Sequence, residues 1–185
     1  MNADNKPYDP SNFKSVFETH KDRVFNTVLS LLQHQQDAED VTQEVFVRAY
    51  ETMSDFKGEA KISTWLYRIA VNTSINHLKA KKTKKRSGFL VSIFGDKSEA
   101  KPLDIPDFVH PGVQLERRER ATRLFKAIDD LSENQKIAFT LSKIEGLPYA
   151  EIAEVMKITI PSVESLLFRA KQNLQKSLKT FYEHF

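Results

Sequence analysis

Cysteine is absent from this sequence of 185 residues. That absence excludes disulfide frameworks, zinc–thiolate sites and cysteine nucleophiles. Long hydrophobic runs are missing too, since no apolar stretch approaches the roughly 20 residues that a membrane-spanning helix needs. The first residues carry neither a basic segment nor an apolar segment of the secretory kind, which predicts a cytoplasmic protein.

Glycine is scarce, and its five residues are too scattered to form a phosphate-binding G-x-G-x-x-G motif or a P-loop. The five histidines show no H-E-x-x-H or other metal-ligand spacing, and no G-x-S-x-G nucleophile motif occurs. We therefore expect no catalytic site, no metal and no cofactor, and nothing in the sequence motivates an enzyme.

The five glycines and seven prolines are unevenly placed, because half of them fall between residues 88 and 112. Both residue types stop helices, so we interpret residues 83–113 as a linker. The linker separates two candidate domains, residues 11–82 and residues 114–185. An apolar patch at 89–94 inside it is either a short docking element or a locally collapsed loop.

Positive charge is concentrated in one block of the chain. The net charge is only +3, and the whole excess can be assigned to the run KAKKTKKR at residues 79–86. Such a run either repels itself into a solvated coil or binds a polyphosphate such as nucleic acid. The run alone leaves both interpretations open.

Apolar residues recur at helical spacing in the N-terminal segment. One stripe runs from Phe13 to Leu32, a second helix is predicted over about 36–54, and a third after Gly58, capped by Ser63 or Thr64. The inward positions of the second and third helices are Val41, Val45, Ala49, Met53, Ile62, Leu66, Ile69, Ala70 and Thr73. No sustained alternation indicates a strand.

The C-terminal segment is helical as well. Helices are predicted over 115–131, over about 133–145 with Ser132 and Gln135 as a capping box, over 148–156 and over about 160–180. Gly146 suits a left-handed helix end. The fold class is therefore all-α, with two small helical domains joined by a flexible linker.

Residues 148–171 have the lengths of a helix-turn-helix: a short helix, a three-residue turn and a second helix. Ala153 is small enough for close helix approach, and Lys157 occupies a turn position where positive φ favours glycine. The outer face of the second helix is polar, as a reader of the DNA major groove must be. An ordinary pair of antiparallel helices with a solvated face is the alternative.

A second polar stripe lies on the third predicted helix, at Arg68, Asn72, Asn76 and Lys79. The aromatic residues Trp65 and Tyr67 adjoin it, and the loop FKGEAK at 56–61 precedes it. Amides bind base edges and aromatic rings stack on unpaired bases, which favours single-stranded DNA binding. The alternative is a core tryptophan beside solvated asparagines.

The second predicted helix carries a charged stripe on one face. Asp37, Asp40, Glu44 and Arg48 share this stripe, and Gln43 is adjacent. A solvated helix face is the default interpretation, and a docking surface for a basic protein is the more specific one.

The motifs resemble a known family. The segments DVTQEVFVRAY at 40–50, FKG at 56–58 and STWLYRIAVNT at 63–73 resemble region 2 of an extracytoplasmic-function sigma factor of the sigma-70 family. The segments EGLPYAEIA at 145–153 and FRAK at 168–171 resemble region 4. The sequence departs from many members at Glu164 and Leu166, where they carry arginine.

This resemblance implies a transcription-initiation factor that directs core RNA polymerase to promoter DNA. Region 2 of the family docks on the clamp helices of the β′ subunit and reads the melted minus-ten element, and region 4 reads the minus-thirty-five duplex and contacts the β flap. The expected polymerase-binding residues are Asp40, Gln43 and Glu44. The expected DNA-binding residues are Phe56, Lys57, Lys61, Trp65, Arg68, Asn72, Asn76, Lys79, Ser162, Glu164, Ser165, Phe168, Arg169 and Lys171.

Two other functions stay open at this point. A stand-alone helix-turn-helix regulator would bind duplex DNA unaided, usually as a symmetric dimer, although no dedicated dimerisation helix is evident. A helical adaptor would explain the acidic second helix but not the basic block. For the sigma-factor interpretation we also expect an anti-sigma protein that covers the face around Asp40 and Glu44.

Overall fold

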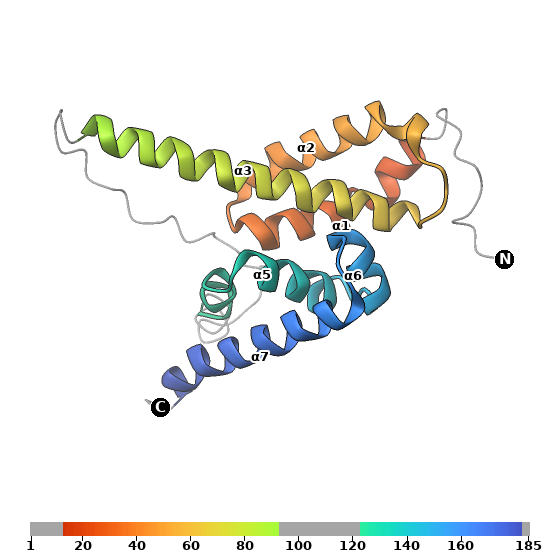
Figure 1. Cartoon of the computed structure of the whole chain (residues 1–185). Coiled ribbons are helices and arrows are strands. Elements are labelled where there is room, and N and C mark those ends of the chain that lie inside the picture. The colour runs from red at the N-terminus through yellow and green to blue at the C-terminus, as the bar shows by residue number, and fades with distance from the viewer. Residues whose placement is uncertain (1–12, 93–122, 183–185) are drawn as a thin grey trace, which may run out of the picture.

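The computed structural model describes the backbone of residues 13–92 and 123–182, which form two packed helical halves (Figure 1). The N-terminal half contains α1 (Phe13–Leu32), α2 (Gln35–Glu51), the 3₁₀ turn η3 (Met53–Asp55) and α3 (Ile62–Ser92). The C-terminal half contains a helix over 123–129, α5 (Glu133–Phe139), the π-helical turn η4 (Thr140–Ile144), α6 (Tyr149–Met156) and α7 (Ile160–Tyr182). The described residues hold no strand, so the all-α prediction is confirmed.

The three long helices of the N-terminal half pack around one apolar cluster. The inward stripe predicted for the second helix is buried throughout, at Val41, Val45 and Ala49 of α2 and at Met53 of η3. From α3, Leu66 is only 1% exposed and contributes to the same cluster, and the Phe46 ring of α2 packs edge-on against Phe17 of α1 at 4.8 Å. The helical spacing of apolar residues therefore places the core correctly, because burial of these side chains is the main force that orients the helices.

Helix α3 is longer than the sequence predicts. We expected the linker to begin at residue 83, whereas the helix continues through the basic run to Ser92. One glycine, Gly88, costs a helix only about 1 kcal/mol, and the lysines and leucines around it are good helix formers. The other expected linker residues, and residues 115–122 of the helix expected over 115–131, lie outside the described residues.

Two predicted helix caps are wrong. Ser132 stands at the N-cap position of α5, but its side chain makes no capping hydrogen bond. Gln135 instead accepts a hydrogen bond from Asn173 of α7 at 3.0 Å, so a contact with a neighbouring helix replaces the capping box. Helix α3 already begins at Ile62, which places the expected cap Thr64 inside its first turn.

The helix-turn-helix prediction is confirmed for α6 and α7. Lys157 ends α6 in the left-handed conformation, with φ 54° and ψ 46°, at a cost of about 1 kcal/mol relative to glycine. Ala153 and Val163 are buried where the two helices meet, together with Leu167. Gly146 has φ 69°, the left-handed end predicted for the preceding helical segment.

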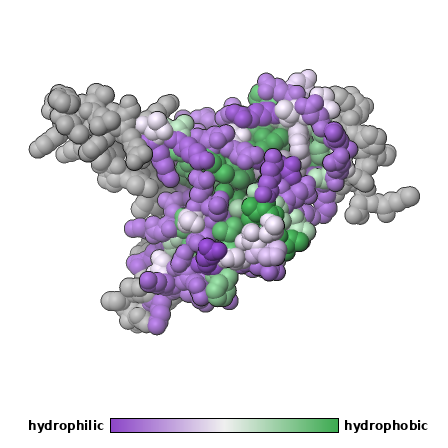
Figure 2. Space-filling model, in the orientation of Figure 1, coloured by the Kyte–Doolittle hydropathy of each residue, from purple (hydrophilic) through white to green (hydrophobic). Residues whose placement is uncertain are grey.

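The two halves share an apolar core. Leu31 of α1 and Tyr67 and Val71 of α3 belong to the same buried cluster as Leu141 and Ile152 of the C-terminal half. Figure 2 shows apolar side chains near the middle of this face, surrounded by hydrophilic residues. The first helix of the helix-turn-helix, α6, therefore packs directly on α3.

No helix in the described part of the chain is long and apolar enough to cross a bilayer.

Candidate polymerase-binding and nucleic-acid-binding surfaces

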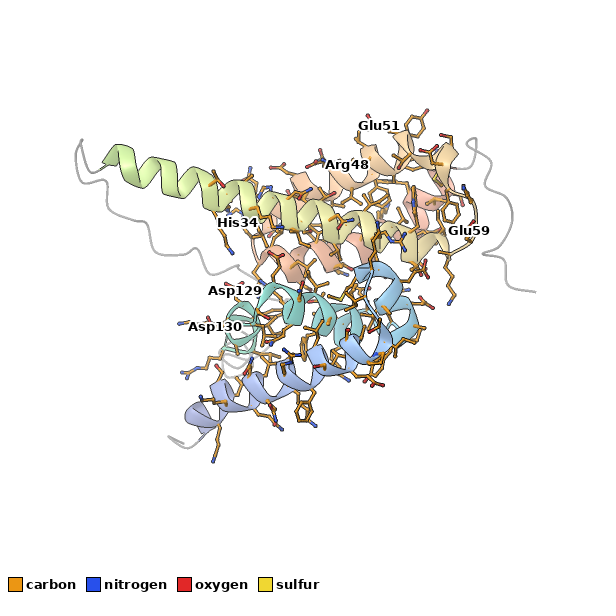
Figure 3. All side chains as sticks on the ribbon, viewed as in Figure 1. His34, Arg48, Glu51, Glu59, Asp129 and Asp130 are labelled. Carbon is orange, nitrogen blue, oxygen red and sulfur yellow. The ribbon has the colours of Figure 1, made fainter. Side chains whose placement is uncertain are left out.

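The outer face of α2 exposes the three residues that we expected to bind polymerase. Asp40, Gln43 and Glu44 are all exposed on this helix. Glu44 accepts two hydrogen bonds from Arg48, at 2.6 and 2.9 Å, so the two side chains are held along the helix surface. Figure 3 shows Arg48 and Glu51 on the side of α2 away from the C-terminal half.

Two apolar residues on α2 were missed by the sequence analysis. Val47 is 56% exposed and Tyr50 is 64% exposed, although both are large and hydrophobic. Val47 is four residues after Gln43 and therefore lies on the same face. The helical spacing could have predicted the exposure of Val47. This residue lies two positions from both Val45 and Ala49 and so falls outside the inward stripe. The face combines carboxylates with exposed apolar surface, as protein-binding patches do.

Asp37 does not belong to this exposed face. Its carboxylate accepts a hydrogen bond from Lys81 of α3, and His77 Nε2 lies 3.3 Å away. Partial burial pushes the pKa of Asp37 up, but the bonds and charge of Lys81 outweigh it and hold the pKa below its ordinary value. His34 Nδ1 also accepts a hydrogen bond from the Asp37 backbone N–H, which caps α2. Asp37 therefore fixes the start of α2 against α3.

The loop before α3 places two aromatic rings together. Phe56 and Trp65 have ring centroids 5.3 Å apart, and both side chains are half-buried. Trp65 packs at the edge of the N-terminal apolar cluster, so part of its ring is core and part is accessible. Lys57 is exposed beside them, and Gly58 has φ 71°, which turns the loop. Aromatic surface next to a cation is suited to an unstacked base.

The polar stripe of α3 divides into two parts. Asn72, Asn76 and Lys79 are exposed to solvent. Arg68, at the start of the stripe, is instead turned toward α6: its guanidinium donates to the backbone oxygen of Glu154 at 2.9 Å and to its carboxylate at 3.3 Å. No pattern in the sequence indicates this contact between Arg68 and α6.

A lysine of the expected DNA surface also contacts the C-terminal half. Lys61 Nζ donates to Glu151 of α6 at 2.7 Å. The other carboxylate oxygen of Glu151 accepts a hydrogen bond from Thr64 at 3.2 Å. Glu151 keeps only 17% of its side chain exposed, so the contact is partly shielded from water.

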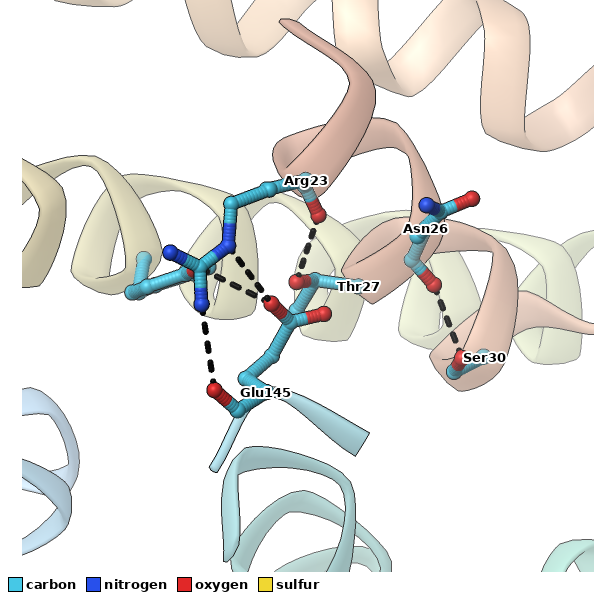
Figure 4. A network of polar contacts seen from close by, with 6 residues as sticks. Arg23, Asn26, Thr27, Ser30 and Glu145 are labelled. Carbon is cyan, nitrogen blue, oxygen red and sulfur yellow. Dashed lines mark hydrogen bonds and ion pairs between the residues drawn. The ribbon is translucent and has the colours of Figure 1, made fainter. Parts of the chain in front are cut away.

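A third carboxylate from the C-terminal half is almost fully buried against the N-terminal half (Figure 4). Glu145 has a side chain that is only 4% exposed, and it accepts a hydrogen bond from the Tyr67 hydroxyl at 2.8 Å. Arg23 of α1 lies beside it, with Nε 3.6 Å from the carboxylate and a second nitrogen 3.1 Å from the Glu145 backbone oxygen. Burial, and then the bond to Glu145, raise the pKa of Tyr67 well above its ordinary value. The hydroxyl therefore stays protonated and continues to donate.

Helix α7 exposes the residues expected to read duplex DNA. Thr159 caps it, accepting a hydrogen bond from the Ser162 backbone N–H at 3.4 Å and pairing with the Ser162 hydroxyl at 2.8 Å. Ser165 is half-buried and accepts a hydrogen bond from Arg169 at 2.7 Å, which orients the guanidinium along the helix. Lys171, two residues after Arg169, is also exposed.

Two other side chains of α7 project into solvent. Phe168 is 63% exposed, a large aromatic ring with no place in the core. Glu164 is also exposed, and within the described residues it forms no ion pair with Arg169 or Lys171. The carboxylate is therefore available to a ligand.

The described residues contain no group of three or more histidines or carboxylates arranged to hold a metal ion. The surfaces above consist of amides, cations, carboxylates, hydroxyls and exposed rings. Such groups bind nucleic acid and protein.

Two family models match the chain, one in each half. Residues 16–84 match Sigma-70 region 2, and residues 121–174 match Sigma-70 region 4. The first match covers α2 and most of α1 and α3, and the second covers the helix-turn-helix.

Curated relatives match over almost the full length. The chain is 30% identical over 171 residues to RNA polymerase sigma-H factor of Pseudomonas aeruginosa, covering 92% of this chain and 88% of that protein. It is 33% identical over 173 residues to the ECF RNA polymerase sigma-E factor of Haemophilus influenzae, covering 90% and 89%.

Two solved structures have the same fold. The sigma factor RpoE in complex with the anti-sigma factor NepR from Bartonella quintana matches with a TM-score of 0.64 at 21% identity, over 91% of this chain and 98% of that one. CnrH in complex with the cytosolic domain of CnrY matches with a TM-score of 0.65 at 20% identity, over 93% and 90%. The chain therefore belongs to the extracytoplasmic-function sigma factors of the sigma-70 family, which are transcription-initiation factors and not enzymes.

Proposed function

We propose that three helices of this sigma factor each bind a different partner or promoter element. Helix α2 docks on the clamp helices of the β′ subunit of core RNA polymerase. The 56–61 loop and α3 read the melted minus-ten element, and α7 reads the minus-thirty-five duplex while region 4 contacts the β flap. The main support for the proposal is the outer face of α2, where carboxylates and exposed apolar residues lie together on a helix that packs on the apolar core.

The chemistry of α2 favours a protein partner over DNA. Asp40 and Glu44 would repel phosphates, whereas they complement a basic helical surface. Val47 adds 56%-exposed apolar surface to the same face, and such surface gains free energy when a partner removes it from water. The Asp37 contacts to α3 hold this helix in a fixed position, which lowers the entropic cost of docking.

The chemistry of α3 and its preceding loop favours unpaired DNA. Phe56 and Trp65 offer ring surface on which a flipped base can stack, and Lys57 is close enough in the chain to meet its phosphate. Asn72 and Asn76 are exposed amides that can hydrogen-bond base edges. Lys79 and the basic run that follows it can neutralise the phosphates of the strand.

Replacing Asn72 with alanine tests the minus-ten assignment. We expect the rate of open-complex formation to fall about tenfold, because one amide contact to an extruded base is lost. The assay is transcription in vitro by core polymerase with this sigma factor, on a promoter selected by the holoenzyme from genomic fragments. Permanganate reactivity of unpaired thymines reports the melted region directly.

The matched control is Asn26→Ala, which removes an exposed amide from α1. It should leave melting unchanged. If Asn72→Ala weakens polymerase binding while melting stays normal, the role assigned to Asn72 is wrong.

Helix α7 carries a polar outer face suited to the major groove. Ser162 and Ser165 are short, and Arg169 and Lys171 supply cations for bases or phosphates. Glu164 can accept a hydrogen bond from the N4 amino group of cytosine, whereas arginine would favour guanine. Phe168 gives apolar contact of the kind that thymine methyl groups accept.

Substitutions of Glu164 distinguish recognition of a specific base from a general effect of the charge of this side chain. With Glu164→Gln and Glu164→Arg, we expect the holoenzyme to change its base preference at one position of a randomised minus-thirty-five library. The preference for cytosine at that position should fall about tenfold, as a hydrogen bond to a charged group contributes roughly 1.5–3 kcal/mol. Sequencing of the bound pool gives the measurement. A uniform gain across all sequences would leave only an electrostatic effect of this carboxylate.

We propose that the protein acts in the cytoplasm, where promoter DNA and polymerase are found, and that an anti-sigma protein regulates it. The two solved structures of this fold are complexes with NepR and with the cytosolic domain of CnrY, which supports such a partner. A protein that covers Asp40 and Glu44 would compete with polymerase for α2. A transcriptionally active complex of all three would contradict this proposal.

A further inference from the structure

The C-terminal part of α3 extends beyond the other helices of the molecule (Figure 1). Among the described side chains of this helix, Leu78 is the last that packs against an apolar cluster. Lys81 then pairs with Asp37 of α2, and Lys82 is exposed. The backbone stays helical to Ser92. The end of α3 therefore projects about 15 Å past Lys82, at a rise of about 1.5 Å per residue.

This projecting part of the helix carries charge of one sign. Helix α3 contains no aspartate or glutamate, whereas the run KAKKTKKR at 79–86 consists almost entirely of cations. Like charges lie four positions apart at residues 81 and 85 and at residues 82 and 86, and this spacing makes them repel each other on a helix. Asp37 of α2 pairs with one of these cations, Lys81. The end of α3 therefore favours a ligand that carries many negative charges.

Apolar residues follow the cations directly. Phe89, Leu90 and Val91 stand in the last turn of the helix, after Gly88. Aromatic and aliphatic side chains gain free energy when they leave water. A ligand that suits the whole segment must therefore offer negative charge and an apolar environment within about 15 Å of each other.

An anionic lipid bilayer offers both properties. Its headgroups attract clusters of lysine and arginine, and each such cation near the surface strengthens binding about fivefold. The boundary between its headgroups and acyl chains accepts aromatic and aliphatic side chains. Duplex DNA matches only the charge of the segment, because its outer edges are phosphates and the apolar residues would remain in water. The pairing of a basic cluster with an apolar segment therefore favours a lipid surface over nucleic acid.

We propose that the end of α3 binds the surface of an anionic lipid membrane. The cations at 79–86 lie among the headgroups, and the apolar residues at 89–91 insert beneath them. The pair between Lys81 and Asp37 joins the start of this segment to α2, so the bound helix holds the folded protein at the surface. Such binding is peripheral and reversible. It goes beyond the promoter roles given above and does not depend on them, although lipid headgroups and DNA phosphates would compete for Lys79 and Lys82.

Cosedimentation of the full-length protein with lipid vesicles tests the proposal. Vesicles of phosphatidylglycerol and phosphatidylcholine in equal amounts provide the anionic surface, and vesicles of phosphatidylcholine alone are the neutral reference. We expect binding to the anionic vesicles to be at least about 100-fold tighter, because several cations contribute together. Circular dichroism verifies that each variant below retains its helices.

The charge contribution is tested by Lys82→Gln with Lys84→Gln and Lys85→Gln. Binding to anionic vesicles should weaken about 100-fold, because three clustered cations are removed. The matched control removes three exposed lysines from other parts of the chain, in Lys14→Gln with Lys126→Gln and Lys143→Gln. It should weaken binding less than about threefold, because cations outside the cluster are largely screened by salt.

The apolar contribution is tested by Phe89→Ser with Leu90→Ser, which changes no charge. Binding to anionic vesicles should weaken at least about tenfold, because two apolar side chains are no longer removed from water. Binding to random-sequence duplex DNA, measured by fluorescence anisotropy, should stay unchanged. Leu124→Ser with Ile144→Ser is the matched control, since these residues are 40% and 43% exposed, and it should leave both affinities unchanged.

Three results would overturn the proposal. Equal binding to anionic and neutral vesicles would show that the cations do not contact lipid. Absence of binding to either kind of vesicle would leave an acidic protein, and not a membrane, as the ligand of this helix end. If the serine variant binds vesicles normally while the glutamine variant loses vesicle and DNA binding alike, the segment attracts any polyanion and is not a membrane-binding element.

Discussion

Replacing Asp40 and Glu44 together with arginine is expected to weaken binding to core RNA polymerase about 100-fold. The two exposed carboxylates of α2 would become cations that face a basic partner, and like charges at an interface cost several kcal/mol. The arginine at position 44 would also meet Arg48, the present partner of Glu44. Titration of fluorescently labelled sigma factor with core polymerase measures the affinity.

The matched control reverses two carboxylates that are not on α2. Asp22 of α1 and Asp130 of the C-terminal half are exposed. Asp22→Arg with Asp130→Arg should change the affinity less than threefold. Equal losses in the two double variants would mean that net charge, rather than the α2 face, determines docking.

Replacing Leu66 with alanine is expected to lower the free energy of unfolding by about 3 kcal/mol. Leu66 is 1% exposed and lies where α1, α2 and α3 meet, so the lost methyl groups leave a cavity that rigid helices cannot close. It belongs to the N-terminal cluster and not to the cluster shared with the other half. Its effect on stability is therefore separate from the contact between the two halves.

Urea denaturation followed by circular dichroism measures this loss. Leu124→Ala, at a leucine that is 40% exposed, should cost less than about 1 kcal/mol. A loss of similar size in both variants would contradict the burial assigned to Leu66.

Local features of the fold were predictable because they repeat in the sequence. The stripe from Val41 to Met53 and the turn at Lys157 follow from helical periodicity and from backbone sterics, and the structure confirms both. The end of α3 was not predictable in this way. A glycine such as Gly88 indicates a helix end only statistically, and the surrounding helix formers outweigh it here.

The contacts between the halves were beyond sequence analysis for a different reason. Glu151 and Glu154 have the pattern of a solvated helix face, and Tyr67 has the pattern of an aromatic residue beside a polar stripe. Their partners are 78 to 90 residues away in the chain, and no period or motif connects them. Most of the site residues expected on α2, α3 and α7 are exposed, whereas Trp65 and Ser165 are half-buried and Arg68 is turned toward α6.

The pairing of Tyr67 with Glu145 also limits how this protein can be engineered. A design for new promoter preferences would join region 2 of one relative to region 4 of another. In such a hybrid, the tyrosine and the carboxylate would come from different parents, and Arg23 would meet an unfamiliar surface. A hybrid that keeps Glu145 but lacks Tyr67 or Arg23 would leave this buried carboxylate without one of its partners. The two regions are therefore better exchanged as a matched pair than as independent modules.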